Sequence, residues 1–305
     1  MDALLGIEIG GTKLQLVLAD IEGTIVERRR FAVARDQGAS GIRECIEREL
    51  PLLAGKHNVQ GTGVGFGGPT NWRTGKIARS HQIEGWSEFD LAGWLGRLTG
   101  APVAADNDAN VAALGEALRG AGKNRDPVFY VTLGSGVGGG LVVDGRIYHG
   151  RIPGEAEIGH LRLDRQGTTL ESRCSGWAVD RRVREAVAIE PTGPLANLVR
   201  QSSGTEARHL SEALKQNDPL ARRIVNEIAQ DLAFGLSHVV HLFHPEVIVL
   251  GGGLSRLGEP LRAETASALD GNIMTVFKPA PDILLTRLDE DVVPIGAIEL
   301  AREIT

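Results

Sequence analysis

The sequence predicts an α/β fold built from two similar halves, because one order of elements occurs twice. Each half opens with a buried strand, a glycine-rich turn and a second strand, with too few residues between the strands for a helix. Strand and helix patterns then alternate along both halves, as they do in α/β proteins. A chain of 305 residues is long enough for two domains with separate cores. The polar loop before Asp126-Pro127 is the expected boundary between them.

In the first half, the spacing of apolar residues predicts three consecutive strands and then alternating helices and strands. Because Gly10 and Gly11 lie between two strands, they are expected to form a β-hairpin, unlike the strand-to-helix glycine loops of Rossmann and Walker sites. The expected elements are strands at 4–9, 14–19, 24–33, 59–66 and 101–105, and helices at 39–53, 90–98 and 109–118.

The second half repeats this opening and then becomes largely helical. A loop-rich segment, 145–175, separates the opening hairpin from the helices and holds several polar clusters. The expected elements are strands at 128–133, 141–143, 246–250 and 283–286, a glycine turn at 134–140, helices between 177 and 243, a helix from Gly253 to about 269 and a last helix at 293–304.

Composition and charge exclude several classes of function. The net charge of −6 gives no basic surface for nucleic acid or for an anionic membrane. The longest apolar stretch, about 224–243, is interrupted by polar residues and predicts a core helix rather than a membrane span. The two cysteines, Cys45 and Cys174, predict no disulfide framework, and the N-terminus shows no leader. We therefore expect a cytoplasmic protein that binds neither nucleic acid nor membrane.

The junction at Asp106-Asn107-Asp108 is the candidate site on which the other predictions depend. An apolar strand stops there and an alanine-rich helix follows. In one interpretation, the polar residues cap the helix by accepting its free N–H groups. In the other, the junction faces a ligand, with a carboxylate as general base and an amide that binds a substrate hydroxyl. The junction alone leaves both interpretations open.

Consecutive glycines in hairpin turns indicate a phosphate site. The chain has 40 glycines, about twice the usual share. Glycine turns expose backbone N–H groups that form an anion nest, to which Lys13 adds a charge and Thr12 a hydroxyl. Such turns can also merely reverse the chain. Their repetition at the start of both halves, with a third run at 251–253, favours phosphate binding.

Five motifs together carry a family resemblance, and they occur in the family's order over essentially the whole chain. They are Glu8-Ile-Gly-Gly-Thr-Lys13, Asp106-Asn-Asp-Ala-Asn110, Gly134-Ser-Gly-Val-Gly138, Glu157-Ile-Gly-His160 and the segment from Pro245 to Gly253. On these motifs the chain resembles the ROK family of sugar kinases, in the larger group that includes hexokinase, actin and the 70-kDa heat-shock ATPases. The resemblance implies two actin-like (ribonuclease H-like) α/β domains with a ligand cleft between them.

The resemblance also implies how the chain is divided. Residues 1–121 with 292–305 would form an N-terminal sugar and phosphate domain, closed by the last helix. Residues 122–291 would form a C-terminal nucleotide-binding and dimerisation domain. Relatives are often dimers, so a homodimer is implied as well.

The resemblance assigns roles to particular residues. Asp108 would be the base that removes the proton from the attacking sugar hydroxyl, and Glu8 would bind Mg²⁺ through water. The sugar would be bound by Gly67, Gly68, Asn107, Glu157, His160 and Glu171. The ATP phosphates and adenosine would be surrounded by Gly10, Gly11, Thr12, Lys13, Gly134, Ser135, Gly136, Gly138, Gly252 and Gly253. His81 could also reach the sugar.

The sequence departs from the family at two places. Position 8 is Glu where many relatives have Asp, which keeps a carboxylate for a metal held mainly by phosphates and waters. The cysteine-rich zinc loop of most relatives is replaced by 161–171, which has no cysteine. Because Cys174 and His160 cannot fill a tetrahedral site, no zinc is expected.

The predicted function is ATP-dependent phosphorylation of a hexose, most simply glucose at its 6-hydroxyl. Fructose and N-acylhexosamines are alternative substrates for the same machinery, and a catalytically silent sugar-binding sensor is an alternative of a different class. The family also includes transcriptional repressors, which carry a DNA-binding winged helix before the first glycine turn. Here that turn is already at Gly10, so we expect no such domain.

Overall fold

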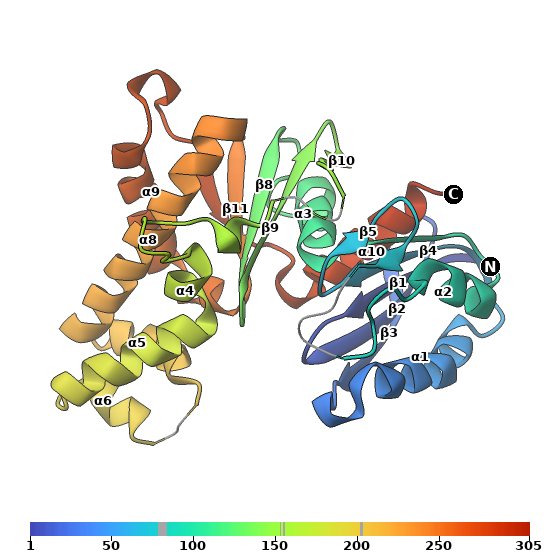
Figure 1. The fold of residues 1–305 in the computed structure, drawn as a ribbon, viewed down its shortest axis with the longest axis horizontal. Coiled ribbons are helices and arrows are strands. Elements are labelled where there is room, and N and C mark those ends of the chain that lie inside the picture. Colours follow the sequence, from blue (N-terminus) through green and yellow to red (C-terminus); the bar gives the residue numbers. More distant parts are fainter. Residues whose placement is uncertain (79–83, 153, 155, 202–203) are drawn as a thin grey trace. The chain divides into compact units, whose positions relative to one another are not determined.

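The computed structural model describes all residues except 79–83, 153, 155 and 202–203. The chain folds into two compact units, each made of several segments (Figure 1). The first unit comprises Met1–Asn124, Gly140–Ala156 and Arg287–Thr305, and the second comprises Arg125–Gly139 and Glu157–Thr286. The domain division expected from the sequence, 1–121 with 292–305 against 122–291, stays a prediction; by compactness, residues 140–156 group with the first unit.

The first unit contains a five-stranded sheet in the order β3-β2-β1-β4-β7. The first three strands form an antiparallel meander, and β4 and β7 continue the sheet in parallel with β1. The predicted hairpin at Gly10-Gly11 is confirmed, since Ile9 pairs with Leu14 across it. The strands are β1 (Asp2–Ile9), β2 (Lys13–Ala19), β3 (Ile25–Ala32), β4 (Asn58–Phe66) and β7 (Val103–Asn107).

A second five-stranded sheet has the order β10-β9-β8-β11-β12. Counted along the chain, both sheets have the spatial order third, second, first, fourth, fifth. In this sheet too the later strands β11 and β12 run parallel to the first, β8. The duplication predicted from the sequence is therefore confirmed at the level of topology. The strands are β8 (Val128–Leu133), β9 (Val137–Val143), β10 (Arg146–Ile147), β11 (Val247–Gly251) and β12 (Asp282–Leu285).

Helices cover both faces of the first sheet. Because side chains alternate along a strand, Leu5 and Ile7 of β1 face the core beneath α1 (Gly38–Ala54) and α2 (Leu91–Thr99). Leu4 points the other way, into a cluster with Ile298 of α10 (Val292–Arg302). Helix α3 (Asp108–Arg119) packs beside α10 on this second face. The sheet is thus buried on both sides, which fixes the strand ends that carry the candidate site.

Two glycines allow α10 to approach its neighbours closely. A β-carbon at Gly296 would lie 1.8 Å from the carbonyl oxygen of Val111 in α3. A β-carbon at Gly63 of β4 would lie 1.8 Å from the carbonyl oxygen of Ala297. Real β-carbons never come so near a backbone oxygen, so these contacts require glycine.

The second unit is largely helical, and α8 is its longest helix (Figure 1). Helix α9 packs along α8, and the shorter helices α4 and α7 also contact it. In the described part of the chain, no helix is both long and apolar enough for a membrane crossing. The helices are α4 (Leu170–Cys174), α5 (Gly176–Ile189), α6 (Pro194–Val199), α7 (His209–Lys215), α8 (Pro219–Phe243) and α9 (Glu259–Asn272).

Several element boundaries differ from those predicted. The strand expected at 101–105 runs over Val103–Asn107, because pairing with β4 continues through Asp106 and Asn107 in spite of their polarity. Likewise β9 begins at Val137, so the second glycine turn is only 134–136 and later glycines lie in the strand. A 3-10 helix, Gly253–Leu257, precedes α9. The two-residue strands β5 (Thr70–Asn71), β6 (Lys76–Ile77) and β10 were not predicted.

Candidate functional site

In the first unit, the ends of three parallel strands bring five predicted residues together. The N–H of Gly67, after β4, donates to the carbonyl of Ile9 at the end of β1 at 2.8 Å. A β-carbon at Gly67 would lie 3.4 Å from Oδ2 of Asp108 and 3.5 Å from Cα of Gly10. The carbonyl of Gly68 accepts a hydrogen bond from Nδ2 of Asn107 at 3.3 Å. Gly67 therefore lies between the Asp108 carboxylate and the hairpin turn, where a larger side chain would contact both.

At the junction before α3, the structure shows which polar residue caps the helix. Asn107 is the N-cap of α3, and its Oδ1 accepts the N–H of Ala109 at 2.8 Å. Asp108 is the first residue of the helix and is half-buried. The positive end of the helix dipole favours a negative charge there, as a general base requires. Asn107 is therefore the residue that caps the helix, and the role of Asp108 as a base stays a prediction.

Sequence reasoning missed the role of Asp106. Its carboxylate is 4% exposed, and it contacts Nε2 of His149 at 2.5 Å. His149 lies in the segment after β10, and its ring stacks on Trp72. Neither His149 nor Trp72 belongs to a recognisable motif, so only the folded chain reveals the cluster. His81, the other histidine considered for the sugar, lies outside the described residues.

Glu8 and Lys13 face each other at the first hairpin. Nζ of Lys13 lies 3.2 Å from Oε1 of Glu8, and Nε2 of Gln15 donates to Oε2 at 2.6 Å. Burial raises the pKa of the Glu8 carboxyl, and Lys13 and Gln15 oppose that shift. The N–H of Gly10 donates to the carbonyl of Lys13 at 2.9 Å, which closes the turn and leaves Thr12 exposed.

The single carboxylate of Glu8 is suited to bind Mg²⁺ through the ion's water molecules rather than directly. Both oxygens of Glu8 already have donors, but each carboxylate oxygen can accept more than one hydrogen bond. Mg²⁺ keeps several waters and takes much of its coordination from phosphates. The donor set therefore fits a hydrated ion held mainly by a nucleotide, with Glu8 as acceptor from its waters.

We expect Glu8→Gln to stabilise the protein near neutral pH. A raised carboxyl pKa means that the folded state holds the proton more tightly than the unfolded chain does. Stability therefore falls as the pH rises from below 4.5 through the folded-state pKa, and an amide removes that loss. The free energy of unfolding should rise by about 1 kcal/mol near neutral pH, with no gain near about pH 4, as measured by urea titration.

The exposed Glu22 gives the control, since Glu22→Gln should change stability at neither pH. A loss of stability in Glu8→Gln near neutral pH would mean that the contacts with Lys13 and Gln15 outweigh the cost of burial.

In the second unit, the remaining predicted sugar residues gather at the second glycine turn. Oε2 of Glu171 accepts the N–H of Val137 at 2.9 Å. A β-carbon at Gly159 would lie 2.2 Å from the carbonyl oxygen of Val137 and 3.5 Å from Cβ of Glu171. The short helix that carries Glu157 and His160 therefore packs directly on this turn and on α4. The side chains of Glu157 and His160 remain exposed.

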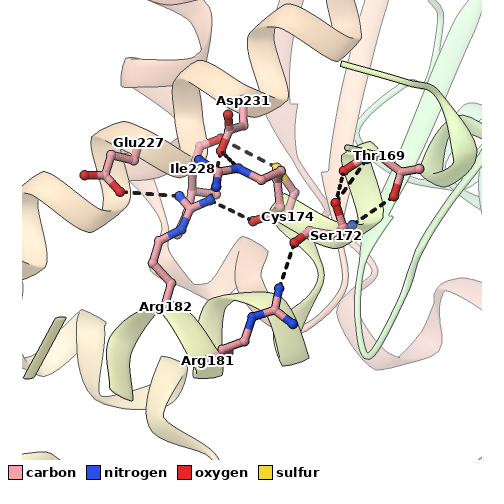
Figure 2. A network of polar contacts seen from close by, with 9 residues as sticks. Thr169, Ser172, Cys174, Arg181, Arg182, Glu227, Ile228 and Asp231 are labelled. Atoms are coloured by element: carbon pink, nitrogen blue, oxygen red, sulfur yellow. Dashed lines mark hydrogen bonds and ion pairs between the residues drawn. The ribbon is translucent and has the colours of Figure 1, made fainter. Parts of the chain in front are cut away.

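Figure 2 shows the hydrogen bonds that connect α4, the helix that contains Glu171, to α5 and α8. The guanidinium of Arg182 donates to Asp231 of α8 at 2.9 Å and to the carbonyl of Arg173 at 3.3 Å. Arg181 donates to the carbonyl of Ser172 at 3.2 Å. At the other end, Thr169 and Ser172 form a reciprocal capping box. These bonds satisfy both ends of a five-residue helix that could not persist alone.

Cys174, the last residue of α4, has a packing role. Burial raises the pKa of its thiol to about 12, and Sγ contacts the carbonyl of Ile228 at 3.8 Å (Figure 2). A thiol in this environment is a poor metal ligand and a poor nucleophile. Among the described residues, no group of three or more His, Cys, Asp or Glu side chains is arranged to hold a metal ion.

A pocket of about 540 Å³ opens beside the second glycine turn, within the second unit. Its walls are largely apolar, with Leu133, Leu254 and Leu257, and its rim carries Arg208 and Arg256. Trp177, 63% exposed, also lines it from the first turn of α5. The predicted residues Gly134, Ser135 and Gly253 line the same pocket.

Gly252 precedes the lining residue Gly253 and packs against the end of β8. Its φ is +77°, and a β-carbon there would lie 2.6 Å from the carbonyl carbon of Leu133. Only glycine allows β11 to turn at this point against the end of β8. The apolar and cationic residues of the pocket come from segments far apart in the chain, so no sequence motif could reveal them. Concave, mostly apolar pockets with a few polar groups are typical of small-molecule sites.

Comparison with known sequences decides the family. The sequence profile described as "ROK family" matches residues 4–304. The chain belongs to the ROK family. Every motif from which the resemblance was inferred lies inside the matched range, and the prediction of the family is confirmed.

Relatives within the ROK family cover the chain almost completely. A glucokinase of Halalkalibacterium halodurans is 30% identical, over 98% of this chain and 94% of the relative. The solved structure of a ROK family glucokinase from Streptomyces griseus, in complex with glucose and AMPPNP, is 30% identical, covers 99% of both chains and has a TM-score of 0.86. The predicted actin-like α/β fold and the class of enzyme, an ATP-dependent sugar kinase, are thereby confirmed.

The ROK family also contains regulators. A putative xylose repressor of Caldicellulosiruptor sp. is 24% identical over 84% of this chain and 67% of the relative. Membership of the family therefore does not fix the sugar.

Proposed function

We propose that this ROK protein transfers the γ-phosphate of ATP to a hexose, most simply to the 6-hydroxyl of glucose. The observation that carries the proposal is the half-buried Asp108 carboxylate at the start of α3, which lies beside Gly67 and the Gly10 turn. The glucose and AMPPNP bound by the Streptomyces griseus relative support the same pair of ligands.

In this mechanism, Asp108 accepts the proton of the attacking hydroxyl as its oxygen bonds to the γ-phosphorus. The bond from that phosphorus to the bridging oxygen breaks, and ADP leaves. Asn107, Glu157, His160 and Glu171 bind the other sugar hydroxyls, whose burial without partners would cost about 1–3 kcal/mol each. The backbone at Gly67 and Gly68 allows the sugar to approach closely.

The glycine turns are proposed to hold the phosphates. Gly11, Thr12 and Lys13 act from the first hairpin, and Gly134, Ser135 and Gly136 act from the second. Gly10 closes the first turn, and Gly138 is the second residue of β9. Backbone N–H groups stabilise the charge that develops on the transferred phosphoryl group. When bound, Mg²⁺ neutralises charge on the β- and γ-phosphates, and Glu8 orients its waters.

We place the nucleoside in the pocket of the second unit, against Gly252, Gly253 and the indole of Trp177. Trp177→Ala should raise the KM for ATP about tenfold, because stacking of a base on an aromatic ring contributes about 1–3 kcal/mol. Trp177→Phe should retain most of the affinity, and the KM for the sugar should stay unchanged in both variants. A KM for ATP in Trp177→Ala within about twofold of wild type would remove the base from this pocket.

The proposal is tested by ADP release from the purified protein with Mg·ATP and a panel of glucose, fructose, mannose and N-acylhexosamines. Turnover with one sugar names the substrate. Turnover with fructose or an N-acylhexosamine selects the alternative kinases. Thermal stabilisation by a sugar without any turnover, also with inorganic polyphosphate as donor, selects the silent sensor.

Magnesium dependence, a homodimer and a cytoplasmic location belong to the same proposal. Titration with EDTA tests the first, light scattering on the eluted protein tests the second, and cell fractionation tests the third.

A further inference from the structure

A histidine–aspartate pair adjoins the proposed base, and none of the roles above uses it. Nε2 of His149 lies 2.5 Å from Oδ2 of Asp106. The two side chains are 15% and 4% exposed. Asp106 lies at the end of β7, two positions before Asp108. His149, by holding Asp106, therefore affects the end of β7, which directly precedes Asp108.

The second carboxylate oxygen of Asp106 organises the start of α3. Oδ1 accepts the N–H of Asn107 at 2.7 Å and a hydrogen bond from Nδ2 of Asn110 at 3.1 Å. Asn107 in turn caps the helix through the N–H of Ala109 at 2.8 Å. One buried carboxylate thus links the backbone N–H of Asn107, the residue before Asp108, to a side chain in the first turn of the helix. Hydrogen bonds to an ionised acceptor are stronger than neutral ones and hold their geometry more tightly.

Burial makes Asp106 depend on His149. A carboxylate taken out of water is costly unless it is paired and hydrogen-bonded. If the donor at position 149 were lost, Oδ2 of Asp106 would lose this partner, and the carboxylate would have to move to find another. That movement changes how Oδ1 holds the N–H of Asn107, and with it the direction of the Asp108 side chain.

The ring of His149 is itself fixed from a third segment. It stacks on Trp72, in the turn between β5 and β6, with ring centroids 4.1 Å apart and an interplanar angle of 16°. The guanidinium of Arg73 lies 4.8 Å from the centroid of the Trp72 ring. Stacking sets the plane of the imidazole, so it sets the direction of Nε2 toward Asp106.

We propose that His149 is a positioning residue for phosphoryl transfer, which through Asp106 holds Asn107 and Asp108 in the geometry that deprotonates the acceptor hydroxyl. Trp72 acts indirectly, because it orients the ring of His149. The inference rests on the proposed function, and it concerns no atom that touches the substrate.

Two substitutions at one position separate the hydrogen bond from the packing. His149→Phe keeps an aromatic ring against Trp72 and removes the donor, whereas His149→Gln restores an N–H donor without the ring. In His149→Phe, kcat should fall about 10- to 100-fold, because small errors in the position of a reacting group have effects of that size. The Kd for the hexose, measured by calorimetry, should change by less than about threefold. His149→Gln should recover part of kcat.

The matched control is His238→Phe, in α8 of the second unit. His238 also contacts an aromatic ring, that of Phe234, and a hydrogen bond joins its Nδ1 to a carbonyl at 2.9 Å. This variant should keep kcat. The inference is overturned if His149→Phe keeps kcat within about twofold of wild type, or if kcat falls equally in His149→Gln and His149→Phe. A lower melting temperature with unchanged kcat also overturns it, since that result marks a purely structural residue.

A second readout keeps this inference separate from the kinase proposal. Amide hydrogen exchange at 107–110 should speed up in His149→Phe and not in His238→Phe, whether or not any sugar is turned over. If wild-type protein phosphorylates no sugar, the proposed function fails. In that case, an unchanged rate of amide exchange at 107–110 in His149→Phe also overturns the role of His149. A faster rate supports the inference that His149 stabilises the start of α3.

Discussion

Asp108→Asn is expected to fold normally and to lose at least about 100-fold in kcat, since a positioned general base contributes about 10²- to 10⁴-fold. The amide has almost the shape of the carboxylate but cannot accept the hydroxyl proton. Asp108 is only half-buried at the first position of α3, and Asn107 supplies the cap, so the helix keeps its start. The Kd for the hexose should change little, because the loss concerns the transition state.

A matched control is Asp90→Asn. Asp90 also precedes a helix of the first unit and accepts the N–H of Gly93 at 3.1 Å, a contact that asparagine preserves. That variant should keep wild-type kcat and melting temperature. If Asp108→Asn turned over the preferred sugar at the wild-type rate, Asp108 would not be the base, and the kinase proposal would lose its central observation.

Gly296→Ala is expected to cost at least about 3 kcal/mol of the roughly 5–15 kcal/mol that stabilises a typical domain. The added β-carbon would lie 1.8 Å from the carbonyl oxygen of Val111, and that oxygen belongs to helix backbone, which cannot swing away. Helices α3 and α10 would have to separate. Since Asp108 starts α3, activity should fall together with stability. Urea unfolding followed by circular dichroism measures the change.

Gly271 provides the opposite case in the same chain. It lies in α9, and a β-carbon there would have no atom within 4 Å. Gly271→Ala should therefore stabilise the protein by about 0.5–1 kcal/mol through the lower entropy of the unfolded chain. If Gly296→Ala were as stable as wild type, the two helices could shift apart freely, and their close packing would not hold the candidate site.

The repeated strand–turn–strand order was sufficient to predict two similar α/β halves, whereas the spatial order of the strands became visible only in the structure. The alternation of apolar residues and the positions of glycines are local signals, and both are present in the segments that form β1, β2, β8 and β9. The boundary of β7 was wrong because its last residues are polar and pair with β4 all the same. Local sequence could not show a hydrogen-bonding partner some forty residues away.

The candidate site was predictable only where its residues lie in motifs. Asp108, Asn107 and Gly67 come together as adjoining strand ends, which a parallel sheet makes likely from sequence order alone. Trp177 and His149, and the contact between His149 and Asp106, could not be predicted, since they depend on segments that lie far apart in the chain. Glu116 is similar: it is fully buried and accepts N–H bonds from Ala121, Arg287 and Leu288, which its place on an alanine-rich helix does not suggest.

The scattered make-up of the first unit has a consequence for biosynthesis. Residues 287–305 leave the ribosome only after the whole second unit has been made, yet they contain α10, which covers β1 and β4. Until then, the face of the sheet that includes Leu4, Val17 and Ala19 has no permanent cover. The nascent chain therefore carries an exposed apolar sheet face through more than half of its translation, a condition that favours aggregation and chaperone capture. Slow translation should lower the yield of native protein, and a chaperone that binds apolar segments should restore it.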